Sequence, residues 1–200
     1  MTRVVLSIGS NLGDRLARLQ SVVDGLQEAV VAVSPVYETD PWGRVGQAPF
    51  LNAVLIANDP ACDAPAWLSR AQEFERAAGR VRGERWGPRT LDVDLIACYQ
   101  TSSAPGGPSR EVEVIAREPN LTLPHSLAHL RAFVMVPWLA IDPDAQLTVA
   151  EGPRPVARLL AELEPADRDG VRLSRLTLNL KRKPVSAPAN SKQADPESES

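Results

Sequence analysis

The sequence has few of the residues on which several common kinds of function depend. Among its 200 residues are two histidines and two cysteines, Cys62 and Cys98, and no histidine lies near either cysteine. This pattern predicts neither a disulfide framework nor a structural zinc site. With no signal peptide in evidence, we expect a reducing, cytoplasmic location. No apolar run approaches the roughly 20 residues that span a bilayer, so we expect no membrane partner.

Two nucleotide-binding signatures are also missing. The chain contains neither GxxxxGK[ST] nor GxGxxG, so any ATP must be bound without a P-loop. The net charge is only −3, which argues against a surface that binds nucleic acid through an overall positive field. The apolar fraction of 44% is ordinary for a globular chain. We predict one domain over residues 1–180 and a disordered, Pro- and Ser-rich tail over residues 181–200.

The most informative stretch is residues 79–94, which read GRVRGERWGPRTLDVD and contain four of the chain's arginines. Its second half alternates, so Thr90, Asp92 and Asp94 are expected on one side of a strand. Carboxylates at this spacing lie about 6–7 Å apart, which suits a hard cation such as Mg²⁺ shared with substrate phosphates. Guanidinium groups are planar donors for phosphate oxygens. Taken alone, the two acids could be polar residues on a solvent-facing side of a sheet, and the arginines could belong to a solvated loop. The combination of acids and arginines predicts a site for polyphosphate and metal.

The order of predicted elements in the first hundred residues is β-α-β-β-α-β. Helices are expected from about residue 12 and over Ala64–Ala78, and strands at Val4–Ile8, Ala32–Tyr37, Phe50–Asn58 and Thr90–Leu95. This is the ferredoxin-like α+β arrangement, an antiparallel sheet with two helices on one face. Later segments, including a helix at Val156–Leu163 and a strand at Val171–Leu180, would add C-terminal strands and a second helical layer, giving three layers αβα.

Three smaller features leave alternatives open. Residues 38–49 are rich in Gly and Pro and are either a binding loop or a plain connection. Glu75 lies near the C-terminus of the second helix, where a carboxylate is unfavourable, so either a local group compensates it or it is solvated. His125 and His129 have the i, i+4 spacing of a metal pair, but Pro124 opposes a helix there and we expect no zinc site.

Taken together, these residues resemble the 6-hydroxymethyl-7,8-dihydropterin pyrophosphokinase family of folate biosynthesis. The resemblance implies an ATP-dependent enzyme that transfers the β,γ-pyrophosphoryl group of ATP to the hydroxymethyl oxygen of the pterin and releases AMP. ATP and the pterin would be its partners, without nucleic acid, and we expect a monomer. The resemblance covers residues 4 to about 140 and rests on residues 8–12, 37–43, 50–52, 79–82, 85–94, 123–125 and 131–133.

The resemblance also implies roles for particular residues. Asp92 and Asp94 would hold two Mg²⁺ ions, and Asp92 would contact the pterin and is a candidate for activating its hydroxyl. Arg80 and Arg89 would close on the phosphates in the transition state. The implied ATP contacts are Glu75, Arg82, Arg85, Trp86, Arg89, Thr122, His125 and Arg131. The implied pterin contacts are Gly9, Thr39, Asp40, Trp42, Phe50, Asn52, Asp92 and Phe133.

The sequence departs from the family pattern at a few positions. Phe50 stands where the family often has Tyr, Ser126 replaces a common Tyr after the histidine, and the loop between Arg82 and Arg85 is one residue shorter than in some members. Two other functions remain as alternatives, a different Mg²⁺-dependent phosphoryl or nucleotidyl transferase and a nucleic-acid-binding ferredoxin-like module. Such a module usually carries aromatics on its central strands, where this chain has acids.

Overall fold

Two long strands, β1 (Thr2–Ser10) and β4 (Phe50–Asp59), pair in antiparallel register at the centre of the main sheet. The computed structural model describes residues 2–41, 48–80, 89–102 and 110–180. The strand order is β11-β3-β4-β1-β5-β6, with β2 also paired to β4. The other strands of this sheet are β2 (Val30–Val33), β3 (Tyr37–Thr39), β5 (Asp92–Ser102), β6 (Arg110–Glu113) and β11 (Val171–Leu173). The expected α+β class with an antiparallel sheet is therefore confirmed.

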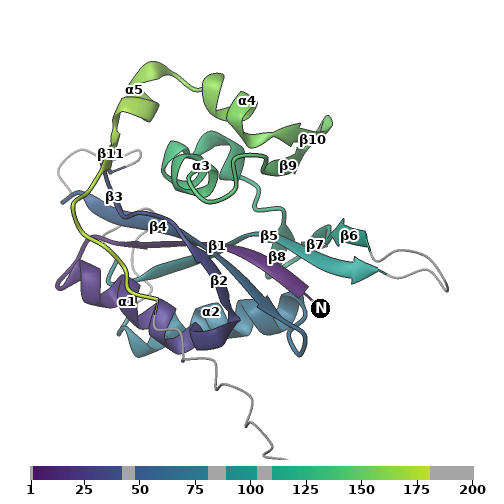
Figure 1. The fold of residues 1–200 in the computed structure, drawn as a ribbon, viewed down its shortest axis with the longest axis horizontal. Helices are drawn as coiled ribbons and strands as arrows, with labels where there is room; N and C mark the ends of the chain where they lie inside the picture. Colours follow the sequence, from purple (N-terminus) through teal and green to yellow (C-terminus); the bar gives the residue numbers. More distant parts are fainter. Residues whose placement is uncertain (1, 42–47, 81–88, 103–109, 181–200) are drawn as a thin grey trace, which may run out of the picture.

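Helices cover both faces of this sheet (Figure 1). Helices α1 (Arg15–Leu26) and α2 (Ala64–Ala77) lie on one face, and α3 (Ala132–Leu139) packs on the other face with α4 (Val156–Ala161) and α5 (Pro165–Asp169) beyond it. Alternate residues of β1 serve the two sides: Val4, Leu6 and Ile8 belong to the core under α1 and α2, whereas Val5 belongs to the core under α3. The central strands are consequently apolar on both faces.

The remaining elements are short. Two small hairpins are formed by β7 (Ala116–Glu118) with β8 (Leu121–Leu123) and by β9 (Gln146–Val149) with β10 (Gly152–Pro155), and 3₁₀ turns span Gln27–Ala29 and Ala128–Leu130. Helix boundaries follow capping chemistry: the side chain of Asp14 accepts a hydrogen bond from Ala17 N, and Gly79 ends α2 with a φ of 71°. No helix in the described ranges is long and apolar enough to cross a membrane.

The strand predicted at Ala32–Tyr37 is wrong in its bounds, because the chain leaves the sheet between β2 and β3. Pro35 lies in this interruption and has no N–H to donate to a ladder. Beside it, the hydroxyl of Ser34 accepts a hydrogen bond from Val54 N at 2.9 Å, and Ser34 N donates to Val54 O at 2.9 Å. Ser34 thus satisfies the backbone hydrogen-bonding groups of Val54 on β4 at the point where β2 and β3 are interrupted.

The strand predicted at Val171–Leu180 is wrong beyond Leu173. After β11 the chain crosses to α1, where the side-chain amide of Gln20 donates to Asn179 O and accepts from Asn179 N, each at 2.9 Å. Leu178 and Leu180 pack against the core on the α1 side. The alternating pattern of this segment therefore reflects packing beside a helix. The predicted tail at 181–200 and the Ser/Pro/Gly segment at 103–109 lie outside the described residues.

Candidate active site

The two acids of β5 share one face of the sheet, as the alternation predicts. Leu91 and Val93 are buried in the core under α1 and α2, while Asp92 and Asp94 face the α3 side with side chains 21% and 29% exposed. The register places Asp92 opposite Gly9 of β1, and Gly9 opposite Asn52 of β4. A row of polar or small residues therefore runs across three neighbouring strands beside the acids.

Cationic side chains converge on both acids. Nη1 of Arg80 lies 2.8 Å from Oδ1 of Asp92, and Arg89 donates to Oδ2 of the same carboxylate. Nη1 of the buried Arg131 donates to Oδ2 of Asp94 at 2.9 Å. Two carboxylates thus face three guanidinium groups, which compensates the repulsion between like charges on one strand face.

His125 completes the surroundings of Asp94. Its backbone N–H donates to Ile96 O at 2.8 Å, and its Nε2 lies 4.0 Å from Oδ2 of Asp94. Burial lowers the pKa of His125, with Arg131 acting in the same direction and the charge of Asp94 against it. Burial, followed by the negative charge of Asp92, raises the pKa of Asp94. Arg131, rather than a protonated histidine, is therefore the permanent cation beside Asp94.

Glu75 is compensated by local groups, which is one of the two alternatives drawn from the sequence. Its Oε1 accepts a hydrogen bond from Val93 N at 2.9 Å and another from Arg80. Its side chain is only 16% exposed. Because Val93 lies between the two acids, Glu75 connects the end of α2 to the strand that carries them.

The polar pair Asn52 and Thr39 lies on the other side of the row. Nδ2 of Asn52 donates to Oγ1 of Thr39 at 2.6 Å, and both residues are buried. Gly9 has no side chain over this pair, and a Cβ placed there would lie 2.4 Å from Oδ1 of Asn52. Phe50 pairs with Thr39 and stands on the same face of β4 as Asn52. These four residues, all expected at the pterin, are thus brought together.

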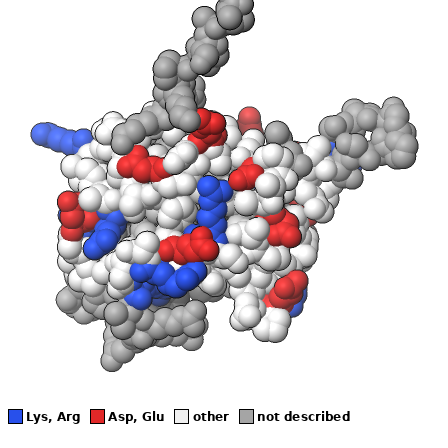
Figure 2. Space-filling view, turned by 90° about the horizontal axis from the view of Figure 1, so that it is seen from below, with Lys and Arg blue, Asp and Glu red and all other residues white. Residues whose placement is uncertain are grey.

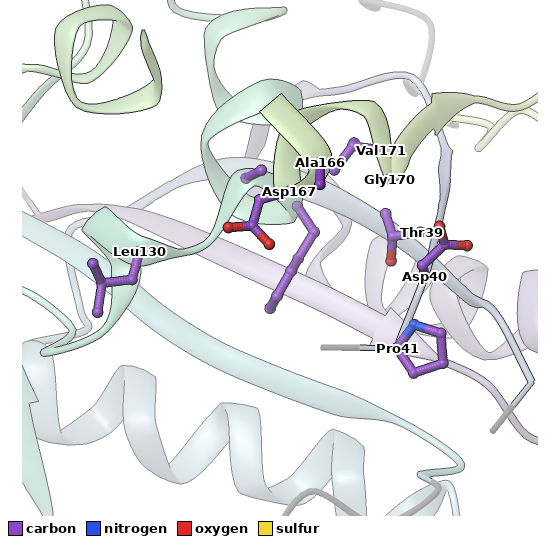
Figure 3. A pocket seen from close by; sticks show the side chains of 10 residues that line it. Thr39, Asp40, Pro41, Leu130, Ala166, Asp167, Gly170 and Val171 are labelled. Atoms are coloured by element: carbon purple, nitrogen blue, oxygen red, sulfur yellow. The ribbon is translucent and has the colours of Figure 1, made fainter. Parts of the chain in front are cut away.

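A cavity of about 130 Å³ opens beside Thr39 (Figure 3). Phe133, at the start of α3, also lines it, and its ring centroid lies 5.6 Å from the guanidinium carbon of Arg131. Asp40 lines the same cavity, but its carboxylate accepts two hydrogen bonds from Arg172. Two expected pterin contacts, Thr39 and Phe133, therefore line one cavity, and Phe133 also lies beside Arg131, the partner of Asp94. The carboxylate of Asp40 is instead bound by Arg172.

The chain matches, over residues 5–143, the family model described as 7,8-dihydro-6-hydroxymethylpterin-pyrophosphokinase (HPPK). The chain belongs to this family. The expectation of a pyrophosphokinase is thereby confirmed, and the two alternative functions are set aside.

Relatives in mycobacteria resemble this HPPK over nearly their whole length. A 2-amino-4-hydroxy-6-hydroxymethyldihydropteridine pyrophosphokinase of Mycobacterium tuberculosis is 72% identical over 187 residues, covering 93% of this chain and 97% of the relative. A protein of the same name from Mycobacterium leprae is 69% identical over 192 residues, covering 96% of this chain and 99% of the relative. These matches cover more of the chain than residues 5–143, so the similarity includes residues outside the match to the family model.

Solved structures share the fold at low identity. The Plasmodium falciparum HPPK-DHPS with SDX-DHP matches with a TM-score of 0.52 and 13% identity, covering 81% of this chain. An HPPK-DHPS in complex with substrates matches with a TM-score of 0.54 and 11% identity, covering 80% of this chain. This HPPK spans less than half of each of those chains, 43% in both cases. The likeness therefore concerns the fold of the HPPK part alone.

Some expected residues of this HPPK are not brought to the acids. Thr122 is exposed on β8 and lines a second cavity of about 560 Å³. His125, which lies beside Asp94, also lines this cavity. Trp42, Arg82, Arg85 and Trp86 lie outside the described residues. On the outer side of α1 and α2, basic and acidic side chains are interspersed (Figure 2), so that face carries no field of one sign among the residues described there.

Two polar residues at the end of β1, Ser10 and Asn11, make contacts that the sequence analysis did not predict, although residues 8–12 are part of the family resemblance. Oδ1 of Asn11 accepts from Arg89 N at 2.7 Å, and Asn11 N donates to Arg89 O at 3.1 Å. The hydroxyl of Ser10 donates to Thr90 O at 2.6 Å. Ser10 and Asn11 thus fix the segment that carries Arg89 in front of the acids. A polar residue that is buried directly after an apolar strand is the signal that could have found them.

Proposed function

We propose that the polar face at the start of β5 is where this chain transfers pyrophosphate from ATP to the hydroxymethyl group of 6-hydroxymethyl-7,8-dihydropterin, in folate biosynthesis. The products are the pterin diphosphate and AMP. The observation that carries this assignment is that Asp92 and Asp94 share one sheet face with the Asn52–Thr39 pair, and only strand β1, at Gly9, lies between Asp92 and Asn52. The acids proposed to bind the polyphosphate through metal therefore lie next to the polar pair proposed to bind the heterocycle.

Two Mg²⁺ ions would be held by Asp92 and Asp94. Carboxylate oxygens are the ligands that Mg²⁺ prefers, and it keeps waters and substrate phosphates as its other ligands. The fit is supported by Oδ1 of Asp92, which is buried and accepts no well-aligned hydrogen bond although Arg80 lies close to it. Among the described residues no three His, Cys, Asp or Glu side chains gather around one point, which agrees with an ion that also needs substrate oxygens. When bound, the ions would supply neutralisation of triphosphate charge.

The arginines would exchange their present partners for phosphates. Arg80 and Arg89 both contact Asp92 and are only partly buried, with side chains 23% and 27% exposed. Neutralisation of Asp92 by a cation would release both guanidinium groups toward the transferring group, where charge develops in the transition state. Arg82, Arg85 and Trp86 belong to the same proposal through the family resemblance alone.

On the nucleotide side, we assign Arg131, His125 and Thr122 to ATP. Arg131 is already oriented by Asp94, and a neutral His125 can donate or accept a hydrogen bond without adding charge. Glu75 also belongs to this set in the resemblance. Its hydrogen bonds to Val93 N and Arg80 support a positioning role that reaches ATP through Arg80.

On the pterin side, Asn52 would bond the amide-like edge of the ring, with Gly9 leaving room for close approach. A flat heteroaromatic gains specificity from aromatic contacts and from buried polar partners at its edge. Phe133 is the described aromatic residue that lines the cavity beside Thr39. Phe50 and Trp42 complete the proposed aromatic surroundings, and Asp92 would contact the hydroxymethyl group and accept its proton.

Three further assignments accompany this function. The strand order β5-β1-β4-β3 with α1 and α2 on one face supports a ferredoxin-like core. A monomer is proposed because the acids, the arginines and the Asn52–Thr39 pair come together within one chain. Two free cysteines, one of them buried, support a reducing cytoplasm.

The test is a single incubation with Mg-ATP, with and without 6-hydroxymethyl-7,8-dihydropterin, followed by chromatography of the nucleotides. AMP formed only with the pterin, in equal amount to a pyrophosphorylated pterin, is the expected result. ADP would indicate phosphoryl transfer and free pyrophosphate would indicate nucleotidyl transfer, and either would overturn the proposal. Asp142→Asn, which changes a carboxylate outside the site, is the matched control for variants of the two acids.

A further inference from the structure

The strand β11 joins the sheet at the edge next to the pterin side of the site. Val171 pairs with Thr39 and Leu173 pairs with Tyr37, while Asp40 N donates to Gly170 O at 3.1 Å. The family model ends at residue 143. A segment beyond that match therefore supplies the neighbour of β3.

An ion pair closes this junction. Nη1 and Nη2 of Arg172 donate to Oδ2 and Oδ1 of Asp40 at 3.0 and 2.7 Å. Two parallel bonds from one guanidinium fix the orientation of a carboxylate as well as its position. The pair lowers the pKa of Asp40 because Arg172 hydrogen-bonds its ionised form. Glu38, the cross-strand neighbour of Arg172, instead approaches Arg15 at 3.5 Å.

The same segment forms a wall of the cavity beside Thr39. Gly170 and Val171, together with Ala166 and Asp167 of α5, line it along with Pro41 (Figure 3). Phe133 lines the same cavity. The C-terminal segment thus touches the space next to the Asn52–Thr39 pair. Because the carboxylate of Asp40 is occupied by Arg172, Asp40 can act on this space only through the backbone it anchors.

We propose that Arg172 is a positioning residue for the pterin: by holding Asp40 it fixes the end of β3, and with it Thr39 and Pro41, against the cavity. This inference rests on the proposed pterin assignment of Thr39 and Asn52. Strand β3 has three residues and pairs with β4 on its other side, so few bonds hold its end. A change at Arg172 therefore acts on the pterin and leaves the ATP side, around Arg131 and Asp94, in place.

The test compares steady-state constants of Arg172→Ala and Arg172→Lys with those of the unchanged chain. We expect the KM for the pterin to rise by about fivefold in Arg172→Ala, with the KM for ATP and the melting temperature unchanged. In Arg172→Lys it should rise less, because one ammonium keeps the charge but cannot form two parallel bonds. The control is Glu111→Ala, which breaks another partly exposed pair with two hydrogen bonds, to Arg3, at the far edge of the sheet.

A charge exchange keeps the proposal open to refutation if Arg172→Ala is unstable. Asp40→Arg combined with Arg172→Asp should restore the KM for the pterin relative to either single variant. The inference is overturned if the pterin KM of Arg172→Ala is unchanged, if both KM values rise together, or if the exchange restores melting temperature without restoring the pterin KM. Failure of the proposed function is a separate outcome, because the unchanged chain would then form no pterin-dependent AMP.

Discussion

Glu75, in the last turn of α2, accepts the backbone N–H of Val93 at 2.9 Å, at the residue between the two acids of β5. The same oxygen accepts from Arg80. One carboxylate therefore fixes both the strand that presents the acids and a guanidinium that faces them. A contact of this kind couples the helix on one side of the sheet to chemistry on the other.

Removal of this carboxylate should damage stability and turnover together. In Glu75→Ala the N–H of Val93 loses its acceptor, which costs about 1–3 kcal/mol, and the shifted acids should lower kcat by about 10- to 100-fold. Thermal unfolding and steady-state kinetics measure both. Glu75→Gln keeps an acceptor and should retain most of the stability. Glu73→Ala, on an exposed neighbour, is the control, and an equal loss of kcat there would contradict the assignment.

Gly9→Ala should weaken pterin binding selectively. Its new Cβ would lie 2.4 Å from Oδ1 of Asn52, so the amide must move and its bond to Thr39 is strained or lost. We expect the KM for the pterin to rise by about tenfold or more, with the KM for ATP little changed. Adding Asn52→Ala removes the clash, so the double variant should be no worse than Asn52→Ala alone. Additive losses would show that Gly9 acts by another route.

Asp94→Asn should separate function from stability. The raised pKa means that ionised Asp94 is less favourable in the folded than in the unfolded chain. Protonated Asp94 therefore stabilises the folded chain at low pH. This stabilisation is lost as the pH rises from the ordinary pKa of 3.8 through the raised pKa of the folded chain. At neutral pH without metal, the melting temperature of Asp94→Asn should equal or exceed that of the unchanged chain.

The same variant should lose turnover, because a neutral amide is a poor Mg²⁺ ligand. The introduced side-chain amide would still offer an oxygen to Arg131, which keeps the local packing. Calorimetry in a chelator and a turnover assay with Mg-ATP are the two measurements. Full activity in a variant that unfolds cooperatively would remove Asp94 from the metal site.

The two cysteines should differ in reactivity. Burial raises the pKa of Cys98 to about 11, and the thiol is fully buried. Cys62 is partly exposed, and burial and the charge of Asp59 raise its pKa. At pH 8 a thiol reagent should therefore modify Cys62 in the folded chain and Cys98 only after denaturant is added. Equally fast modification of both cysteines in the folded chain would contradict this prediction. So would the absence of any modification of Cys98 in the Cys62→Ser variant after denaturant is added.

The parts predicted well are those in which local pattern and tertiary structure agree. The alternation of residues 90–95 was sufficient to place the acids on one face, because apolar residues at the other positions are drawn into the core. The helix ends at Asp14 and Gly79 likewise depend on interactions within a few residues.

The parts that could not be predicted depend on contacts between distant segments. Ser10 and Asn11 act on residues about eighty positions away, and Asp40 meets a partner 132 positions away. Residues 174–180 alternate like a strand, yet Gln20 of α1 satisfies the backbone of Asn179 instead of a neighbouring strand. No pattern within a short window distinguishes a sheet partner from a glutamine side chain.

The hydrogen bonds between Gln20 and Asn179 also fix residue 180 on the α1 side of the sheet, which sets the side from which a group joined there would extend. Leu178 and Leu180 lie against the core on the α1 side, whereas Asp92 and Asp94 face the α3 side. A label, surface linker or fused protein joined at this position would begin with the whole thickness of the sheet between it and the acids. The enzyme could therefore be immobilised through residue 180 with its reaction face turned to the solution.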